Sequence, residues 1–356
     1  MSVLVFPSCI DSCLPFIEEA RRLGQRLVGA SSLADDPHAS RFDVWSHLPY
    51  LQDESFTGAL AALIKDEKIT SLFTSHAPTF HFFSQHPALL TNKVNLLGPG
   101  PYAKQSGVVR NAFVGIDEKM QRIDRYANRS SNYTQAFIAS LLHHAEQIYG
   151  ECQTEKILAL CGALADAPAG DVIEIGSFFG KSAYVLNRIA TATGVGTTLA
   201  VDSWNMAISV QKESPEEIQS LSAVWDWELV FQGFLMAMAS SAAGGGFNYL
   251  RLPSDQAWRI YDANKGITSP EFGHTQASGQ IALLHIDGNH DEACVREDFQ
   301  LWSQRLANQG WLVFDDYAWS HGNGPRIVAD QVVADYADRV LRRFVAGGAL
   351  FLKMAR

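Results

Sequence analysis

Short apolar runs alternate along this chain with amphipathic helical patterns, and no other feature of the sequence limits the possible fold as strongly. The apolar runs cover residues 2–6, 26–30, 69–74, 171–176, 198–202, 247–252, 281–287 and 311–316. Strands that alternate with helices form parallel sheets with right-handed crossovers, because each helix returns the chain to the same edge of the sheet. The sequence therefore predicts an α/β fold.

A break in this pattern divides the chain. The length of 356 residues suggests two domains, and the segment 98–101, Gly-Pro-Gly-Pro, can continue neither a helix nor a strand. We predict a small accessory α/β domain at 1–105, a helical linker at 106–168 that caps the second domain, and a larger α/β domain at 169–356. The accessory domain is expected to serve substrate selection or contacts within a homo-oligomer.

Composition argues against several partners. The formal net charge is −10 without a cluster of Lys and Arg, which disfavours a nucleic-acid backbone as partner. No apolar stretch reaches the ~18 residues of a transmembrane helix, and the N-terminus lacks the basic residues of a signal peptide. Five cysteines without zinc-type spacing indicate reduced thiols. We expect a cytoplasmic protein with no membrane partner.

A glycine turn follows the first strand of the larger domain, where residues 173–182 read IEIGSFFGKS. Gly176 and Gly180 let a ligand approach the backbone, and the helix that follows offers free N–H groups. Glu174, at the strand end, is placed to face a cationic or hydroxylated ligand. A phosphate loop is disfavoured, because it needs four residues between its glycines and this turn has three. The alternative interpretation is an ordinary turn between a strand and a helix.

Acidic residues follow the next two strands. Asp202 ends the run 198–202, where an acid is placed to bind the ribose hydroxyls of an adenosine-type ligand. Ser203 and Trp204 follow directly, and Trp204 either stacks near the ligand or belongs to the core. Asp255, after the third strand, either contacts the adenine or caps the next helix.

Three further acids follow two later strands. Asp287 closes the run 281–287, and Asp315 and Asp316 close the run 311–316. Ligands of open parallel sheets bind beyond the carboxyl ends of the strands, so we expect these carboxylates to meet there. Grouped carboxylates repel one another unless a cation bridges them, and such oxygen ligands suit Mg²⁺, Mn²⁺ or Ca²⁺. The alternative is that Asp315 and Asp316 only cap the following turn.

Histidines near these acids are candidate bases. His290 is predicted to accept a hydroxyl proton beside the metal near neutral pH, and the alternative is a histidine that only caps the helix beginning at 291. His285 lies inside an apolar strand, which favours a core histidine, and His321 lies in a loop that is able to line the substrate pocket. Asp287 and His290 are therefore the predicted catalytic residues.

Together these motifs resemble the class I S-adenosylmethionine (SAM)-dependent methyltransferases. The resemblance rests on EIGSFFGKSA, LAVDSW and the strand ends IDGNH and FDDY, and it covers roughly residues 170–320. The branch that it resembles most is the metal-dependent, sugar-type small-molecule O-methyltransferases. It implies a Rossmann-like sheet that ends in a reversed hairpin at Val340–Met354, with its turn at Gly347 and Gly348.

The resemblance also implies roles for single residues. The expected SAM contacts are Glu174, Gly176, Ser177, Gly180 and Asp202, and the expected metal ligands are Asp287, Asp315 and Asp316. Some relatives use a second acid, two residues after the first, as base. Here that position is Asn289, which cannot accept a proton, so either His290 takes the role or the chemistry does not depend on a metal. The N-terminal domain, which ends in NLLGPGP, resembles the small α/β domain that precedes ATP-grasp domains.

We therefore predict a SAM-dependent O-methyltransferase, assisted by a divalent metal, that acts on a hydroxyl of a sugar or a glycosylated natural product. One alternative is a metal-dependent hydroxylase of similar fold, whose non-haem iron would need two histidines and one carboxylate. The other alternative is a non-catalytic binding protein that keeps the SAM-binding fold.

Overall fold

The structure is a computed structural model of the chain, and it describes residues 2–90, 93–242, 244–264 and 266–356. Contacts divide the chain into two compact units, Met1–Asn111 and Ala112–Arg356. Along the described residues, no helix combines the length and the apolar character needed to cross a lipid bilayer. The division at 105/106 and 168/169 into independently folding parts stays a prediction.

The first unit contains a five-stranded parallel sheet with helices on both faces. Its strands are β1 (Ser2–Val5), β2 (Arg26–Ser31), β3 (Val44–His47), β4 (Ser71–Phe73) and β5 (Asn95–Leu96), in the order β3-β2-β1-β4-β5. Its helices are α1 (Leu14–Arg22), α2 (Phe56–Asp66) and α3 (Ala77–Gln85), with short 3-10 helices at Asp11–Cys13, Ala39–Arg41 and Pro87–Leu90. One apolar cluster joins α1 to the sheet, and another joins α2 and α3 to it, so the sheet is buried between two layers.

Four helices connect the two sheets along the chain. They are α4 (Pro101–Phe113), α5 (Ile116–Ala127), α6 (Gln135–Ala145) and α7 (Thr154–Ala165). The predicted helical linker is therefore made of separate helices, and between α6 and α7 Gly150 has a φ of +148°, which no helix contains. Apolar residues of α5, α6 and α7 belong to a core cluster of the second unit.

The second unit contains a seven-stranded sheet with Rossmann-like topology. Its strands are β6 (Asp171–Ile175), β7 (Thr198–Asp202), β8 (Phe247–Arg251), β11 (Ile281–Ile286), β12 (Leu306–Phe314), β13 (Val340–Ala346) and β14 (Ala349–Met354). Their order is β13-β14-β12-β11-β6-β7-β8. Only β14 runs antiparallel to its neighbours β12 and β13, which confirms the predicted reversed hairpin and the predicted fold class.

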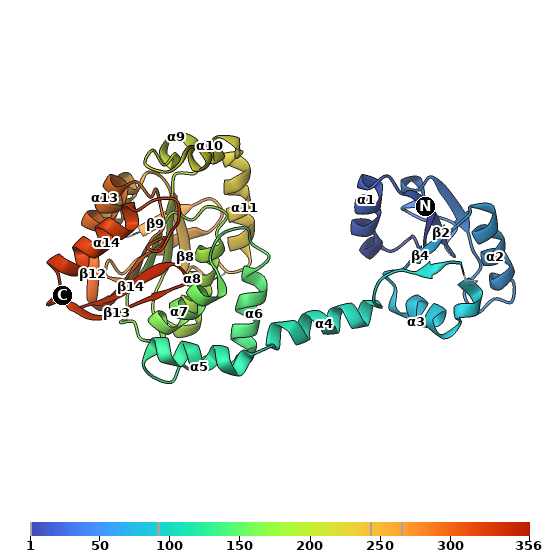
Figure 1. Ribbon diagram of the computed structural model, residues 1–356, viewed down its shortest axis with the longest axis horizontal. Coiled ribbons are helices and arrows are strands. Elements are labelled where there is room, and N and C mark those ends of the chain that lie inside the picture. The colour runs from blue at the N-terminus through green and yellow to red at the C-terminus, as the bar shows by residue number, and fades with distance from the viewer. Residues whose placement is uncertain (1, 91–92, 243, 265) are drawn as a thin grey trace. The chain divides into compact units, whose positions relative to one another are not determined.

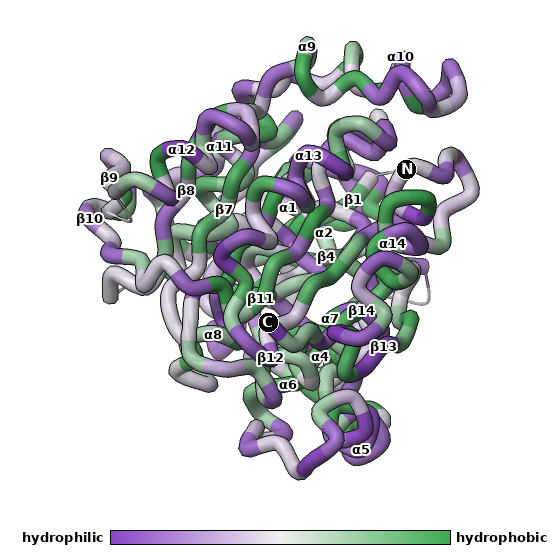
Figure 2. The backbone as a smooth tube through the Cα atoms, turned by 90° about the vertical axis from the view of Figure 1, so that its left-hand side faces the viewer, coloured by the Kyte–Doolittle hydropathy of each residue, from purple (hydrophilic) through white to green (hydrophobic). Residues whose placement is uncertain are grey.

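Helices cover both faces of this sheet (Figure 1). On one face, α8 (Lys181–Thr193) and α11 (Trp227–Ala239) share an apolar cluster with α5, α6 and α7. On the other face, α12 (Ser254–Asn264), α13 (Glu292–Trp302) and α14 (Gly324–Asp335) share a second cluster. Along β6, Val172 belongs to the first cluster, whereas Ile173 and Ile175 belong to the second, as expected for a strand buried on both faces. Figure 2 shows the hydrophobic β11 and the hydrophilic outer helix α5.

Several elements of the second unit differ from the sequence-based expectation. Helix α9 (Met206–Ser209) precedes α10 (Glu216–Val224), and the two lie next to each other at one end of the unit (Figure 1). Strands β9 (Gly266–Ser269) and β10 (Gly273–Gln276) form an antiparallel hairpin that is not among the predicted strands. A 3-10 turn at Ser303–Arg305 follows α13, and β12 begins five residues before the apolar run 311–316 that predicted it.

Candidate active site

The carboxyl ends of five strands of the second unit surround one cavity of about 870 Å³. Residues that follow β6, β7, β8, β11 and β12 line it, together with residues of α7, α9 and α10. Nine of the predicted site residues are in this lining: Gly176, Ser177, Asp202, Ser203, Asp255, Asp287, His290, Asp315 and Asp316. The cavity therefore lies where ligands of open parallel sheets bind.

Gly176 joins the turn after β6 to the loop after β11. Its φ is +84°, and a Cβ at this position would lie 2.0 Å from the carbonyl oxygen of Asp287, so a larger residue does not fit. The amide of Asp287 donates a hydrogen bond to the carbonyl oxygen of Ile175 at 2.8 Å. The glycine turn thus holds Asp287 directly beside itself at the rim of the cavity.

Asp202, the last residue of β7, braces the same turn. Its carboxylate accepts hydrogen bonds from the amides of Ser177 at 2.9 Å, Phe178 at 3.0 Å and Trp204 at 2.8 Å. Burial raises the pKa of Asp202, although these three amides act in the opposite direction. Phe178 has a φ of +48°, so the turn adopts an unusual backbone conformation that the Asp202 carboxylate stabilises.

A buried chain of charged groups runs behind the aspartates. Ser177 Oγ donates to Glu174 Oε2 at 2.6 Å, and His285 Nδ1 lies 3.2 Å from Glu174 Oε1. His285 Nε2 lies 3.6 Å from Asp315 Oδ2. Lys156 of α7 donates a hydrogen bond to Asp315, and its Nζ lies 3.9 Å from Asp287 Oδ2. Lys156 is therefore the ammonium partner of two of the predicted metal ligands.

The pKa values in this chain follow from its charges. Burial lowers the pKa of His285, but the neighbouring carboxyl groups of Asp315, Glu174 and Asp287 together outweigh burial and raise it to about 10. Burial lowers the pKa of Lys156, but Asp315, Cys152 and Asp287 together outweigh burial and raise it. The same cations hold the pKa of Asp315 well below its usual range despite burial. Burial, and next the charge of Asp315, raises the pKa of Asp287 well above its usual range.

His290 faces the other side of the aspartates. Its Nε2 lies 3.2 Å from Asp316 Oδ2 and 3.9 Å from Asp287 Oδ1, and its ring stands edge-on to Trp319 with the centroids 4.8 Å apart. Burial lowers the pKa of His290, and Asp316 opposes that effect without reversing it. A neutral imidazole beside two carboxyl groups is able to accept a proton or to bind a metal.

Three predicted cofactor residues lie elsewhere, which corrects the expectation for them. Glu174 is fully buried beneath the turn and holds Ser177 and His285 rather than facing the cavity. Gly180 has a φ of +89° and is the N-cap residue before α8, and a Cβ there would touch Phe234 of α11 at 3.0 Å. Glu174, Gly180 and Trp204 are not among the described residues that line the cavity.

Trp204 is the third of these residues, and its position decides between the two readings of the sequence. Its side chain packs against Phe234 with ring centroids 4.5 Å apart, and its Nε1 donates to the carbonyl oxygen of Phe178 at 2.8 Å. The Trp204 side chain is buried and is not part of the cavity lining, and its backbone has a φ of +43°. It is a core residue and does not stack on a ligand.

Asp255 does not cap its helix, which was one of the two expectations for this residue. Helix α12 begins at Ser254, so Asp255 lies in the first turn and is not the N-cap. Its carboxylate lies 3.4 Å from Arg259 one turn later and remains part of the cavity lining. A contact between Asp255 and the adenine stays a prediction.

Sequence reasoning missed two buried charged residues of this site. Lys156 is the lone cation of the otherwise apolar helical stretch 156–164, a signal that the sequence contains. Asp298 of α13 also lines the cavity, and burial raises its pKa to about 7. Nothing in the sequence distinguishes Asp298 from the other acids of its helix. Both side chains come from helices, whereas the predictions considered only strand ends.

Aromatic rings form one wall of the cavity, which the sequence also did not indicate. The ring of Phe178 lies 4.6 Å from that of Trp225 and 5.9 Å from that of Tyr149, measured between centroids. Trp227 stands edge-on to Trp225 at 5.5 Å. These residues belong to three separate segments, so only the folded chain brings them together.

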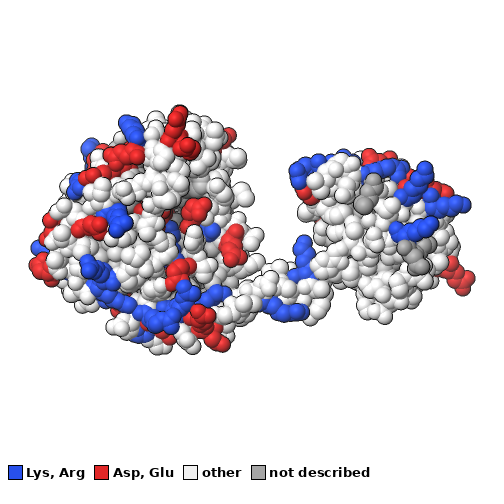
Figure 3. Space-filling model, in the orientation of Figure 1, with Lys and Arg blue, Asp and Glu red and all other residues white. Residues whose placement is uncertain are grey.

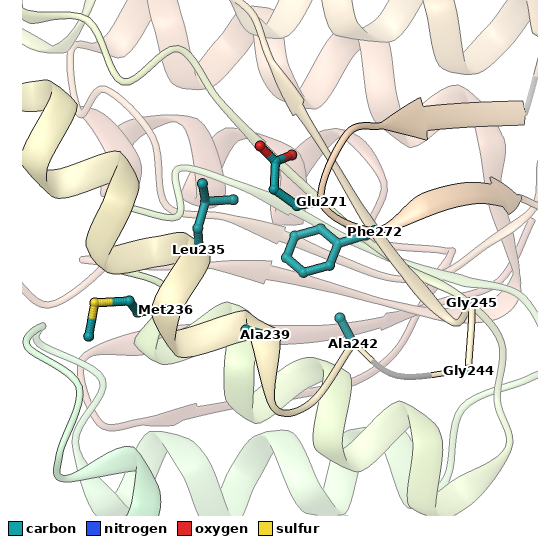
Figure 4. A pocket seen from close by; sticks show the side chains of 8 residues that line it. All are labelled: Leu235, Met236, Ala239, Ala242, Gly244, Gly245, Glu271 and Phe272. Carbon is teal, nitrogen blue, oxygen red and sulfur yellow. The ribbon is translucent and has the colours of Figure 1, made fainter.

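A second, smaller hollow of about 520 Å³ lies beside α11 (Figure 4). It is mostly apolar, and the side chains drawn there include Leu235, Met236 and Phe272 with the single acid Glu271. Glu271 Oε2 already accepts a hydrogen bond from Tyr249 at 2.6 Å. This hollow contains none of the predicted site residues.

On the surface, acidic and basic side chains are interspersed in the view of Figure 3.

One known protein family matches part of the second unit. Residues 173–317 match the model of a family described as a methyltransferase domain. No curated protein matches the chain. The family match confirms the predicted enzyme class, a SAM-dependent methyltransferase, and the matched range contains the glycine turn and the acids at 287, 315 and 316.

Solved structures with similar folds include the O-methyltransferase NovP, at 14% identity over 56% of this chain and 80% of that chain, with a TM-score of 0.41. The calicheamicin methyltransferase CalS11 matches at 14% identity over 67% of this chain and 91% of that chain, with a TM-score of 0.42. The methyltransferase MycE, in complex with Mg, SAH and mycinamycin VI, matches at 14% identity over 53% and 45%, with a TM-score of 0.31. At this level of similarity, no residue of the chain takes a role from these proteins.

Proposed function

We propose that this methyltransferase transfers the methyl group of SAM to a hydroxyl of a small molecule, such as a sugar or a glycosylated natural product, with the help of a divalent cation. One observation carries the proposal: Asp287, His290 and Asp316 meet in the same cavity as the glycine turn after β6. A proton acceptor and a candidate cation site thus lie beside the place proposed for the cofactor.

The cavity has room for two ligands. Its volume of about 870 Å³ is near the upper end of the roughly 300–1,000 Å³ typical of small-molecule sites. We assign SAM to the side formed by Gly176, Ser177, Asp202, Ser203 and Asp255, where the carboxylate of Asp202, which accepts three amide hydrogen bonds, still has about one lone pair for a ribose hydroxyl. The acceptor then occupies the side nearer to His290, under α9 and α10.

The charges of the site support a divalent cation. With every carboxyl group ionised, Glu174, Asp287, Asp315 and Asp316 carry four negative charges, and Lys156 and His285 carry two positive ones. Two negative charges remain in a mostly buried place, and one divalent cation would balance them.

Asp287 and Asp316 are the residues we assign to hold the cation, because Asp315 already contacts Lys156. A site with one or two carboxylates that leaves room for substrate is typical of Mg²⁺. When bound, such a cation supplies Lewis acidity that makes a neighbouring hydroxyl easier to deprotonate.

His290 is the proposed base. Its Nε2 accepts the proton of the acceptor hydroxyl, and the oxygen forms a bond to the methyl carbon while the bond from that carbon to the sulfonium sulfur breaks. The products are the methyl ether, S-adenosylhomocysteine and a protonated His290. Because burial lowers the pKa of His290, the ring is neutral and ready to accept a proton at pH 7.

The hydroxylase alternative finds no support in the geometry. Among the described residues, each group of side chains able to hold a metal contains a single histidine, whereas the iron site needs two. The buried His285 is engaged with Glu174 and Asp315 and does not point into the cavity with His290.

Calorimetry on the full chain tests the cofactor, and a turnover assay tests the rest. We expect SAM and S-adenosylhomocysteine to bind, and S-adenosylhomocysteine to be released with at least one member of a panel of hydroxylated acceptors. Turnover should fall at least tenfold in EDTA and return with Mg²⁺. Turnover that is indifferent to EDTA would contradict the role of the cation, and methylation of amines alone would contradict O-methylation.

A further inference from the structure

Two candidate cation sites share one aspartate, Asp287, at the wall of the cavity, and the first of them includes the buried His285 behind that wall. The first set is His285, Asp287 and Asp315, and the second is Asp287, His290 and Asp316. In each set the ligand atoms lie within 4.8 Å of one another. A dinuclear centre bridged by Asp287 would use both sets, as two-metal enzymes do.

The ammonium group of Lys156 already contacts two aspartates of the first set. Lys156 donates a hydrogen bond to Asp315, and its Nζ lies 3.9 Å from Asp287 Oδ2. Only 4% of the Lys156 side chain is exposed, so water does not screen this charge effectively. His285 Nε2, which is buried, points toward Asp315 and has no hydrogen-bond partner among the described residues.

The fold fixes Lys156 in this position. Residues 156–164 of α7 are buried without exception, and the turn of the β13–β14 hairpin packs against the start of the helix. A Cβ on Gly347 would lie 2.6 Å from the Lys156 amide nitrogen, so this turn has no space for a larger residue. The ammonium group is therefore delivered by a firmly packed helix and does not swing freely in solvent.

We propose that Lys156 is the resident cation of the His285, Asp287 and Asp315 set and restricts the enzyme to one divalent ion. This inference deepens the proposed function and rests on its cation site. The ammonium group repels a metal ion at the first set and neutralises Asp315, whereas the second set stays open. Helix α7 lies outside the matched range 173–317, so the segment before that domain completes the site.

Titration of the full chain with Mn²⁺, by calorimetry and by electron paramagnetic resonance, tests the proposal. The wild type is expected to bind one Mn²⁺, and the K156A variant one more, because the lost side chain frees space and the carboxylate of Asp315, and the added ion displaces the proton of His285. The matched control is K353A: Lys353 Nζ lies 2.7 Å from Asp166 Oδ2 with 12% of its side chain exposed, and neither residue lines the cavity. K353A should bind as many ions as the wild type.

The outcomes separate this inference from the proposed function. If the wild type binds no Mn²⁺ and K156A binds one, Lys156 is the resident cation but the cation in the proposed function is wrong. The inference is overturned if K156A binds no more Mn²⁺ than the wild type, or if the wild type binds two ions.

A second variant keeps the test decisive if K156A does not fold, which circular dichroism would show. D315N removes a ligand of the first set only. It should still bind as many Mn²⁺ ions as the wild type, with an affinity within about tenfold, since the bound ion uses Asp287 and Asp316. Loss of an ion in D315N would overturn the proposal.

Discussion

The two units use the same alternation of strands and helices, yet the acidic residues at the carboxyl ends of their strands have different surroundings. In the first unit, Asp36 after β2 accepts hydrogen bonds from the hydroxyl of Ser8, the amide of His38 at 2.7 Å and Nε1 of Trp45 at 3.1 Å. In the second unit, the acids at the corresponding edge crowd one another around a cavity. Satisfied acids stabilise a fold, whereas crowded acids at a cavity are available for chemistry.

Of the substitutions that test this difference between the two units, replacing Asp287 by Asn is expected to have the largest effect. The change removes a carboxylate that we assign to the cation while keeping the shape of the side chain, and we expect methyl transfer to fall about a thousandfold, as for the loss of several kcal/mol of transition-state stabilisation. SAM affinity should change little. Release of S-adenosylhomocysteine under saturating SAM is the measurement.

The matched control for this variant is D166N, since Asp166 pairs with Lys353 outside the cavity. D166N should retain methyl transfer within a few-fold of the wild type. Equal losses in D287N and D166N would mean that the site acids act only through stability.

The sequence predicted the strand ends better than their surroundings. Strand β7 has the predicted bounds, and Asp202, Asp287 and Asp315 reach the predicted edge because a parallel sheet brings the ends of its strands together. Trp204 was ambiguous, since its left-handed φ of +43° and its packing against Phe234 are both features of the folded chain. Such an angle is set by tertiary contacts and not by the local residue pattern.

The contacts of Lys156 could not be predicted from the sequence for a different reason. Its partners Asp315 and Asp287 lie in other elements, and a single lysine at the start of an apolar helix gives no hint of which residue it will meet. The short strands β3 and β5 and the hairpin of β9 and β10 were missed for a related reason. Their runs of two to four residues are too short for a periodic pattern to appear.

Asp298 in the second unit and Asp36 in the first allow the two units to be compared through the free energy of unfolding. Asp298 is 6% exposed and Asp36 is 8% exposed, so both are buried acids. Burial raises the pKa of Asp298 from 3.8 to about 7. Because the pKa is higher in the folded state, the stabilisation that this group gives is complete below pH 3.8 and is lost as the pH rises to about 7.

The D298N variant, which cannot ionise, should escape this loss. Relative to the wild type, its free energy of unfolding should rise by about 3 kcal/mol between pH 5 and pH 8. Denaturant melts of both proteins at the two pH values measure the difference. A D298N effect that is the same at both pH values would contradict a neutral, protonated Asp298 in the folded state.

The same substitution at Asp36 should have the opposite sign. In D36N the amide group replaces one carboxylate oxygen, so Trp45 Nε1 loses its acceptor while the amide of His38 keeps one. We expect the first unit to lose about 2 kcal/mol of stability, the usual cost of an unsatisfied buried donor. Hydrogen exchange of peptides from 26–47 reports on this unit, and methyl transfer at low temperature should be unchanged. A stabilising D36N would remove the distinction between the two edges.

The smallest effect is expected at Asn289, where the second unit also satisfies polar groups internally. Its Nδ2 donates to the carbonyl oxygens of Ile208 and Val210 at 3.0 Å each, and so ties the segment around α9 to the loop after β11. N289A removes both bonds, which are worth about 1 kcal/mol each at most in this half-exposed place. Hydrogen exchange in residues 206–213 should quicken by about tenfold, while exchange in β7 stays as in the wild type. Unchanged exchange in 206–213 would show that Asp291, which accepts from the amides of Lys212 and Glu213 at 2.9 and 2.8 Å, is enough to hold this segment over the cavity.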